Sequence, residues 1–147
     1  MTITLHGACC TLGGGGILIR GESGMGKSSL ALLLAASDDG ALVADDRIVC
    51  VLCNGRIVMR AHPALAGRVE VRGQGILSVA DLGLASDDEA ELDLVVDLVA
   101  ASPRLPAPPE PADILGIPVP RLILDRGVRA AGLAPLLIRA ALRKPRP

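Results

Sequence analysis

The chain has 147 residues, enough for one domain with a buried core, because a domain of this size hides most of the surface that its unfolded chain exposes. Half of the residues are hydrophobic and none is aromatic, which excludes a reader of single-stranded nucleic acid that stacks bases on rings. A nucleotide base bound here must lie against aliphatic groups or backbone. The formal net charge of −1 also argues against binding to nucleic acid or to a membrane surface.

No signal peptide and no apolar run long enough to cross a bilayer can be recognised, so we expect a cytoplasmic protein. The four cysteines fit that compartment as reduced thiols. Cys50 and Cys53 form a C-x-x-C pair, but residues three apart on a strand point to opposite faces. We therefore expect both to pack in the core rather than to bind zinc.

The first expected elements are the two strands of an N-terminal β-hairpin, 3–11 and 17–20, joined by a glycine-rich turn at 13–16. A glycine-rich loop at 21–27 follows, and an apolar stripe with helical spacing predicts a helix at 28–36.

A short buried strand is expected at 41–44, ending in Asp45 and Asp46. Strands 47–53 and 56–60 then flank an Asn-Gly dipeptide, which suits a two-residue hairpin turn because both positions tolerate positive φ.

The remaining expected elements are strands at 69–72, 76–79 and 117–125 and an amphipathic C-terminal helix at 128–143, kinked or divided at Pro135. Segment 91–100 is compatible with a helix, but its alternation of apolar residues favours a strand. Segment 102–111 contains five prolines and must be an extended surface segment. Several hairpins combined with two helices predict an α/β domain with a mixed sheet.

Residues 21–28 match the phosphate-loop pattern G-x-x-x-x-G-K-[ST] at every required position, after an apolar strand and before a helix. The glycines let backbone N–H groups turn toward phosphate oxygens, and the helix N-terminus favours an anion. Lys27 would bridge the terminal phosphates and the Ser28 hydroxyl would bind Mg²⁺. The residues expected to bind the nucleotide are Gly21, Glu22, Ser23, Gly24, Met25, Gly26, Lys27, Ser28 and Ser29.

A phosphate loop also needs an acidic residue at the end of a buried strand for its metal ion. Asp45 and Asp46 provide two adjacent acids that would point in opposite directions. One could face the metal while the other, beside the phosphate, takes a proton from an attacking hydroxyl. On spacing alone, a polar turn after the strand is an equal alternative.

In this order along the chain, five segments resemble the HPr kinase/phosphorylases, which phosphorylate a serine of the phosphocarrier protein HPr and in many cases reverse the reaction. They are His6 with its following glycine, the loop at 21–28, Leu-Val-Ala-Asp-Asp-Arg at 42–47, Glu-Val-Arg-Gly-Gln-Gly-Ile-Leu at 70–77 and Leu-Gly-Ile-Pro-Val-Pro-Arg at 115–121. The resemblance covers nearly the whole chain and corresponds to the family's C-terminal catalytic domain alone. Short forms of this kind look like those of α-proteobacteria.

The resemblance implies a P-loop kinase domain at 1–147, related in fold to phosphoenolpyruvate carboxykinase, that uses ATP and Mg²⁺. It implies an HPr-type phosphocarrier of a phosphotransferase system as the protein substrate. Homo-oligomer formation and the reverse, phosphorylase reaction stay open.

The resemblance also assigns roles by position. Lys27 would hold the terminal phosphates, and Asp46 would be the base that takes the serine proton, with Asp45 beside it in support. Magnesium would be bound by Ser28 and Glu70, with Asp45 as the acid of the buried strand. His6 would lie near the phosphates, and Arg126 would replace a catalytic arginine that the family carries after its last strand.

Two other functions stay open. A small-molecule kinase would need a closed acceptor pocket and usually an arginine-rich lid, which the sequence does not obviously contain. A regulatory module could bind a nucleotide without transferring its phosphate.

Overall fold

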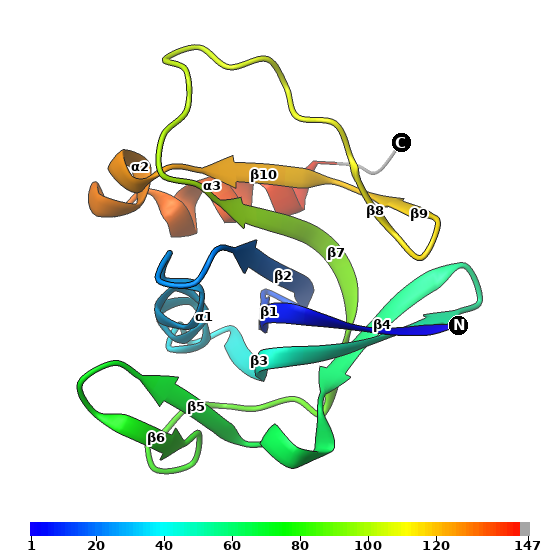
Figure 1. Cartoon of the computed structure of the whole chain (residues 1–147), viewed down its shortest axis with the longest axis vertical. Coiled ribbons are helices and arrows are strands. Elements are labelled where there is room, and N and C mark those ends of the chain that lie inside the picture. The colour runs from blue at the N-terminus through cyan, green and yellow to red at the C-terminus, as the bar shows by residue number, and fades with distance from the viewer. Residues whose placement is uncertain (145–147) are drawn as a thin grey trace.

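The computed structural model describes residues 1–144 as a curled central sheet with helices on one side (Figure 1). The sheet has six strands in the order β10-β7-β2-β1-β3-β4. Their bounds are β1 Thr2–Leu12, β2 Gly15–Gly21, β3 Gly40–Cys53, β4 Arg56–Ala61, β7 Glu89–Leu98 and β10 Arg121–Leu124. The pairs β2–β7 and β7–β10 are parallel and the other pairs are antiparallel.

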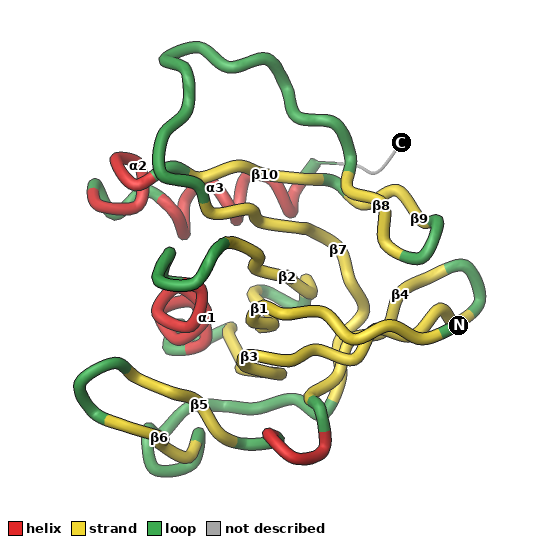
Figure 2. Tube along the Cα trace, in the orientation of Figure 1, coloured by secondary structure: helices red, strands yellow, loops and turns green. Residues whose placement is uncertain are grey.

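Smaller elements surround this sheet, as the colours of Figure 2 show. Two hairpins lie outside it, one formed by β5 Arg68–Val71 and β6 Gly75–Ser78, the other by β8 Ala112–Ile114 and β9 Ile117–Val119. The helices are α1 Lys27–Ala35, α2 Arg126–Ala130 and α3 Ala134–Arg143, with a short 3-10 turn, η1, at Pro63–Leu65. Helix α1 packs on β1 and β3, whereas α3 packs on β7 and β10.

The sheet curls because β7 pairs not only with its neighbours β2 and β10 but also with β4, the strand at the far edge of the sheet. The beginning of β7, at 89–91, is antiparallel to β4, and its remainder is parallel to β2 and β10. Side chains on successive strand positions point to opposite faces. In β1, Ala8 and Cys10 therefore join the core beneath the helices, while Cys9 joins a second core on the other face, which the β8–β9 hairpin covers.

Several sequence predictions are confirmed. The N-terminal strands form an antiparallel hairpin, the strand favoured at 91–100 is present as β7 at 89–98, and Asn54 and Gly55 turn between β3 and β4 with positive φ. Every residue of the proline-rich segment 102–111 is exposed, and it forms the long arch between β7 and β8 (Figure 2). The fold is therefore mixed α/β with a mostly antiparallel central sheet. No helix within residues 1–144 combines the length and the apolar character needed to cross a membrane.

Three predicted elements were wrong in their bounds. The strand expected to end at Asp45 continues to Cys53, because its ladder with β1 runs through both acids with one register shift. The strand expected at 117–125 is divided into β9 and β10 at Pro120, which cannot donate a backbone hydrogen bond. The C-terminal helix is divided into α2 and α3 near Gly132, whose φ is 77°, and Pro135 lies in the first turn of α3.

The cysteine prediction holds for Cys50 and is wrong for Cys53. Cys50 is buried in the middle of β3, whereas Cys53 is the last residue of that strand and is exposed. This end of the strand lies outside both clusters of buried residues, so its final side chain is exposed.

Candidate active site

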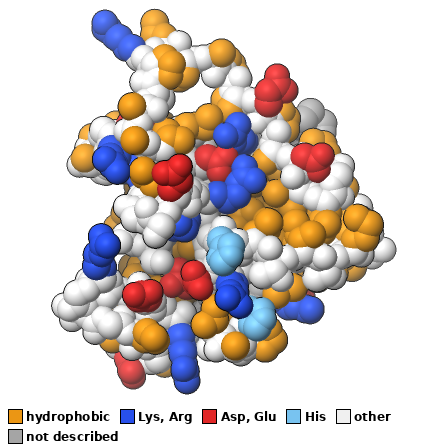
Figure 3. Space-filling model, viewed as in Figure 1, with side chains coloured by type: hydrophobic (Ala, Val, Ile, Leu, Met, Phe, Trp, Pro, Cys, Tyr) orange, Lys and Arg blue, Asp and Glu red, His pale blue; other side chains and the backbone are white. Residues whose placement is uncertain are grey.

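An open pocket of about 360 Å³ lies at the N-terminus of α1. The phosphate loop and the beginning of the helix contribute Ser23, Gly24, Gly26, Lys27, Ser28 and Ser29 to its lining. Distant segments contribute Gly7, Asp45, Asp46, Glu70 and Arg72. Acidic and basic side chains gather on this face of the molecule beside α1 and β3 (Figure 3).

The loop conformation depends on glycine at two positions. Gly24 and Gly26 have φ of 84° and 93°, a region that residues with a Cβ rarely adopt. Helix α1 begins directly afterwards, and no side chain caps its N-terminus. The first backbone N–H groups of a helix have no partner within the helix, and the helix dipole adds positive potential there. This end of α1 can therefore bind an anion.

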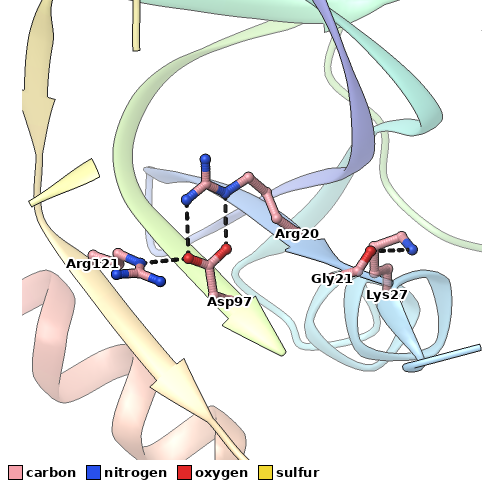
Figure 4. Close-up of polar contacts among 5 residues, drawn as sticks. All are labelled: Arg20, Gly21, Lys27, Asp97 and Arg121. Carbon is pink, nitrogen blue, oxygen red and sulfur yellow. Dashed lines mark hydrogen bonds and ion pairs between the residues drawn. The ribbon is translucent and has the colours of Figure 1, made fainter. Parts of the chain in front are cut away.

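Lys27 and Arg129 both donate to backbone carbonyls of the loop. The Lys27 ammonium donates to the carbonyls of Gly21 at 2.8 Å and Glu22 at 3.1 Å (the Gly21 contact is drawn in Figure 4). The Arg129 guanidinium, from the end of α2, donates to the carbonyl of Met25 and, at 2.9 Å, to that of Val99. The loop is thus fastened to the C-terminal part of the fold as well as to its own helix.

Asp45 is buried against the loop and links two segments. Its Oδ1 accepts a 2.6 Å hydrogen bond from the Ser28 hydroxyl, and its Oδ2 accepts a 3.3 Å bond from the backbone N–H of Glu70. Burial raises the pKa of Asp45 above its ordinary value, although the bonds from Ser28 and Glu70 oppose this change. The carboxyl group therefore positions both the loop serine and the β5 strand.

Asp46 is exposed and lines the pocket, so the two adjacent acids do face different surroundings. Its φ of 69° is unusual for a residue in the middle of a strand, where it lies opposite Gly7 of β1. The carboxylate is accessible within the pocket, beside the helix N-terminus. An accessible carboxylate at this place can accept a proton from a hydroxyl group that approaches a bound phosphate.

Glu70 lies on β5 and Arg72 directly follows the end of that strand; both are exposed and line the pocket. Together with Ser28 and Asp45, Glu70 supplies oxygen ligands of the type that Mg²⁺ prefers. No group of three or more histidine, cysteine or acidic side chains that could hold a metal alone is present in the described part of the chain. This arrangement fits Mg²⁺, which is commonly held by one or two carboxylates together with substrate phosphates.

Not every predicted site residue lies at the pocket. His6 is exposed on β1 opposite Arg47 and does not line the pocket, whereas its neighbour Gly7, opposite Asp46, does. Arg126 is exposed at the beginning of α2 and does not line the pocket. The arginine of this segment that contacts the loop is Arg129, one helical turn later, which the sequence did not indicate.

Of the predicted nucleotide-binding residues, Gly21, Glu22 and Met25 are absent from the pocket lining. Gly21 and Glu22 instead hold the lysine through their carbonyls, and Met25 lines a second pocket.

A charged cluster near the loop was also missed. Asp97 of β7 accepts hydrogen bonds from Arg20 at 2.8 and 2.9 Å and from Arg121 at 2.5 Å, as Figure 4 shows. Burial raises the pKa of Asp97, but the bonds from the two arginines outweigh it and hold the pKa below its usual range. A single acid within the apolar run Leu-Val-Val-Asp-Leu-Val was the available signal, because a buried charge needs a partner.

Comparisons with known proteins show the family. The family model described as HPr Serine kinase C-terminal domain matches residues 1–144. The chain is 39% identical over 150 residues to the HPr kinase/phosphorylase of Bordetella petrii, covering 97% of this chain and 48% of that relative. It is 35% identical to the HPr kinase/phosphorylase of Burkholderia cenocepacia, covering 95% and 45%.

A solved structure is also similar: the HPr(Ser) kinase/phosphatase from Coxiella burnetii, with a TM-score of 0.78 and 32% identity. The match covers 96% of this chain and 88% of that one. The chain spans about half the length of the curated relatives that it matches.

Proposed function

Because this chain belongs to the HPr serine kinase C-terminal domain family, we propose that it transfers the γ-phosphoryl group of ATP to a serine of an HPr-type phosphocarrier protein. The observation that carries the proposal is the accessible Asp46 carboxylate in the same pocket as the uncapped N-terminus of α1. One group can accept a proton there while the other holds phosphate.

In the proposed reaction, the phosphates lie against the loop amides and Lys27 neutralises their charge. Asp46 takes the proton of the substrate serine hydroxyl while the serine oxygen forms a bond to the γ-phosphorus. The bond from that phosphorus to the β,γ-bridging oxygen breaks, which releases ADP. Ser28, Asp45 and Glu70 would hold Mg²⁺, which lowers the repulsion between the phosphate charges when it is bound. In the reverse direction, Asp46 would act as the acid.

Further properties stay predictions. They are the cytoplasmic location, the kinship with phosphoenolpyruvate carboxykinase, homo-oligomer formation and the reverse reaction. The contributions of His6 and Arg126 also stay predictions; both residues are exposed and lie outside the pocket lining.

The test is transfer of labelled γ-phosphate from ATP, with Mg²⁺, to the HPr-type protein of the same organism. Asp46→Asn and Lys27→Ala should each abolish serine labelling, because one loses the base and the other a phosphate contact. Asp81→Asn and Lys144→Ala make the same changes at exposed residues away from the pocket and should retain it.

Phosphoryl transfer that persists in Asp46→Asn would refute the assignment of Asp46 as the base. Nucleotide binding that depends on Lys27, without any transfer to an HPr-type protein, would instead favour a nucleotide-sensing module or a kinase with another acceptor.

A further inference from the structure

A second pocket, of about 230 Å³, adjoins the phosphate loop and shares Gly26 and Ser29 with the first. Its walls are mainly apolar. The loop and α1 supply Met25, Leu30 and Leu33, and the segment from α2 to α3 supplies Gly132, Ala134 and Pro135. The pocket therefore continues from the phosphate site along the side of α1.

We propose that this second pocket holds the purine base of the nucleotide whose phosphates lie in the first, an inference that rests on the proposed function. A helix rises about 1.5 Å per residue, so the seven steps from Gly26 to Leu33 cover roughly 10 Å. A base in the second pocket would thus stay connected, through ribose and triphosphate, to the loop amides. The pocket does not include Asp46, which leaves that carboxylate accessible to the acceptor hydroxyl.

The chemistry of the walls fits a flat, uncharged and weakly polar ring. The chain contains no aromatic residue, so the base must pack on aliphatic groups. Leu33 lines this pocket although 56% of its surface is exposed, which makes it an accessible apolar wall beside an anion site. Burial of such surface against a base is favourable, because it removes apolar area from water.

Arg129 fastens the second pocket to the phosphate loop. It lines the second pocket and donates to the carbonyl of Met25 in the loop and to that of Val99 at the end of the sheet. Burial is the main cause that lowers the pKa of this guanidinium, followed by the nearby Arg126. Arg129 is thus a positioning residue that holds the end of α2, and with it the wall segment that follows, against the loop.

The experiment is isothermal titration calorimetry of the whole chain with two probes, ATP and inorganic tripolyphosphate, each with Mg²⁺. Both carry three phosphates, but only ATP has a base. We expect ATP to bind at least about tenfold more tightly than tripolyphosphate. Leu33→Asn should weaken ATP binding about tenfold through the lost apolar contact and change tripolyphosphate binding less than about twofold.

Leu136→Asn is the matched control. Leu136 is 62% exposed on α3 and does not line the pocket, so the same substitution there should change neither affinity. Both changes are neutral, which avoids repulsion of the phosphates. Losses of ATP affinity in both variants would point to an apolar surface rather than a base pocket and would overturn the inference.

Equal affinity of the wild type for the two probes would also overturn it. If Lys27→Ala then abolished tripolyphosphate binding, the phosphate site of the proposed function would be supported and only the base pocket would be refuted. If neither probe bound in a Lys27-dependent manner, both would be refuted.

Discussion

The backbone conformation at Asp46 predicts that Asp46→Gly is more stable than Asp46→Ala, the reverse of the order expected within a strand. With φ of 69°, this residue has a left-handed conformation within β3. That conformation costs an ordinary L-residue about 1–2 kcal/mol, whereas glycine adopts it freely but loses about 0.5–1 kcal/mol more conformational entropy on folding. Asp46→Gly should therefore be more stable than Asp46→Ala by about 0.5–1 kcal/mol.

The adjacent residue is the control. Arg47 is exposed in the same strand and does not have positive φ, which among the described non-glycine residues occurs at Asp46, Asn54 and Leu115. Here the usual order should hold, with Arg47→Gly less stable than Arg47→Ala by about 0.5–1 kcal/mol. Urea unfolding, with the free energy of unfolding extrapolated to water, measures both differences.

An Ala variant at Asp46 that equals or exceeds the Gly variant in stability would refute the reasoning, because the left-handed backbone would then carry no cost. Both Asp46 variants should lack phosphoryl transfer, since both lose the carboxylate. A Gly variant that is stable but inactive would mean that the strained backbone is retained for the position of the carboxylate, not for the fold.

Two further predictions concern the surroundings of the site. Gly7→Ala should lower the free energy of unfolding, measured by urea denaturation, by about 1–3 kcal/mol, because the added Cβ would lie 2.4 Å from the carbonyl oxygen of Ile19. Gly127→Ala is the control: its Cβ would approach nothing closer than 3.4 Å, so this variant should be as stable as the wild type or more stable. An equal loss of stability in both variants would contradict the prediction. Two arginines hold the pKa of Asp97 in the folded protein below its usual range. The carboxylate therefore contributes fully to the free energy of unfolding above the unfolded-state pKa of about 4, and this contribution is lost as the pH falls through the folded-state pKa. The free energy of unfolding of Asp97→Asn should therefore fall less than that of the wild type between about pH 5 and pH 3. Equal decreases in the free energy of unfolding of the two proteins over this range would contradict the prediction.

The structure agrees with the sequence prediction wherever the signal is local. The loop at 21–28 lies between β2 and α1, and Asn54 and Gly55 form the expected turn, because such motifs depend on the conformations that a few adjacent residues allow. Alternation within 91–100 predicted the strand that the structure places at 89–98, for the same reason.

Prediction was weaker where a residue's surroundings come from distant segments. His6 and Gly7 are adjacent, and strand pairing decided that Gly7 rather than His6 lines the pocket. Arg126 and Arg129 were not distinguishable in the sequence, and the end of α2 brought the second of them to the carbonyl of Met25.

The sequence by itself determined the glycine-rich loop motif at 21–28, the pair of acids that follows it and the absence of aromatic rings, since these are properties of neighbouring residues or of composition. Tertiary structure alone decided that Asp45 is buried against Ser28 while Asp46 opens to the pocket, and that α1 and the start of α3 form an apolar wall beside the loop. The reason is that side-chain burial and pocket shape depend on strand register and helix packing between segments that are far apart in the chain.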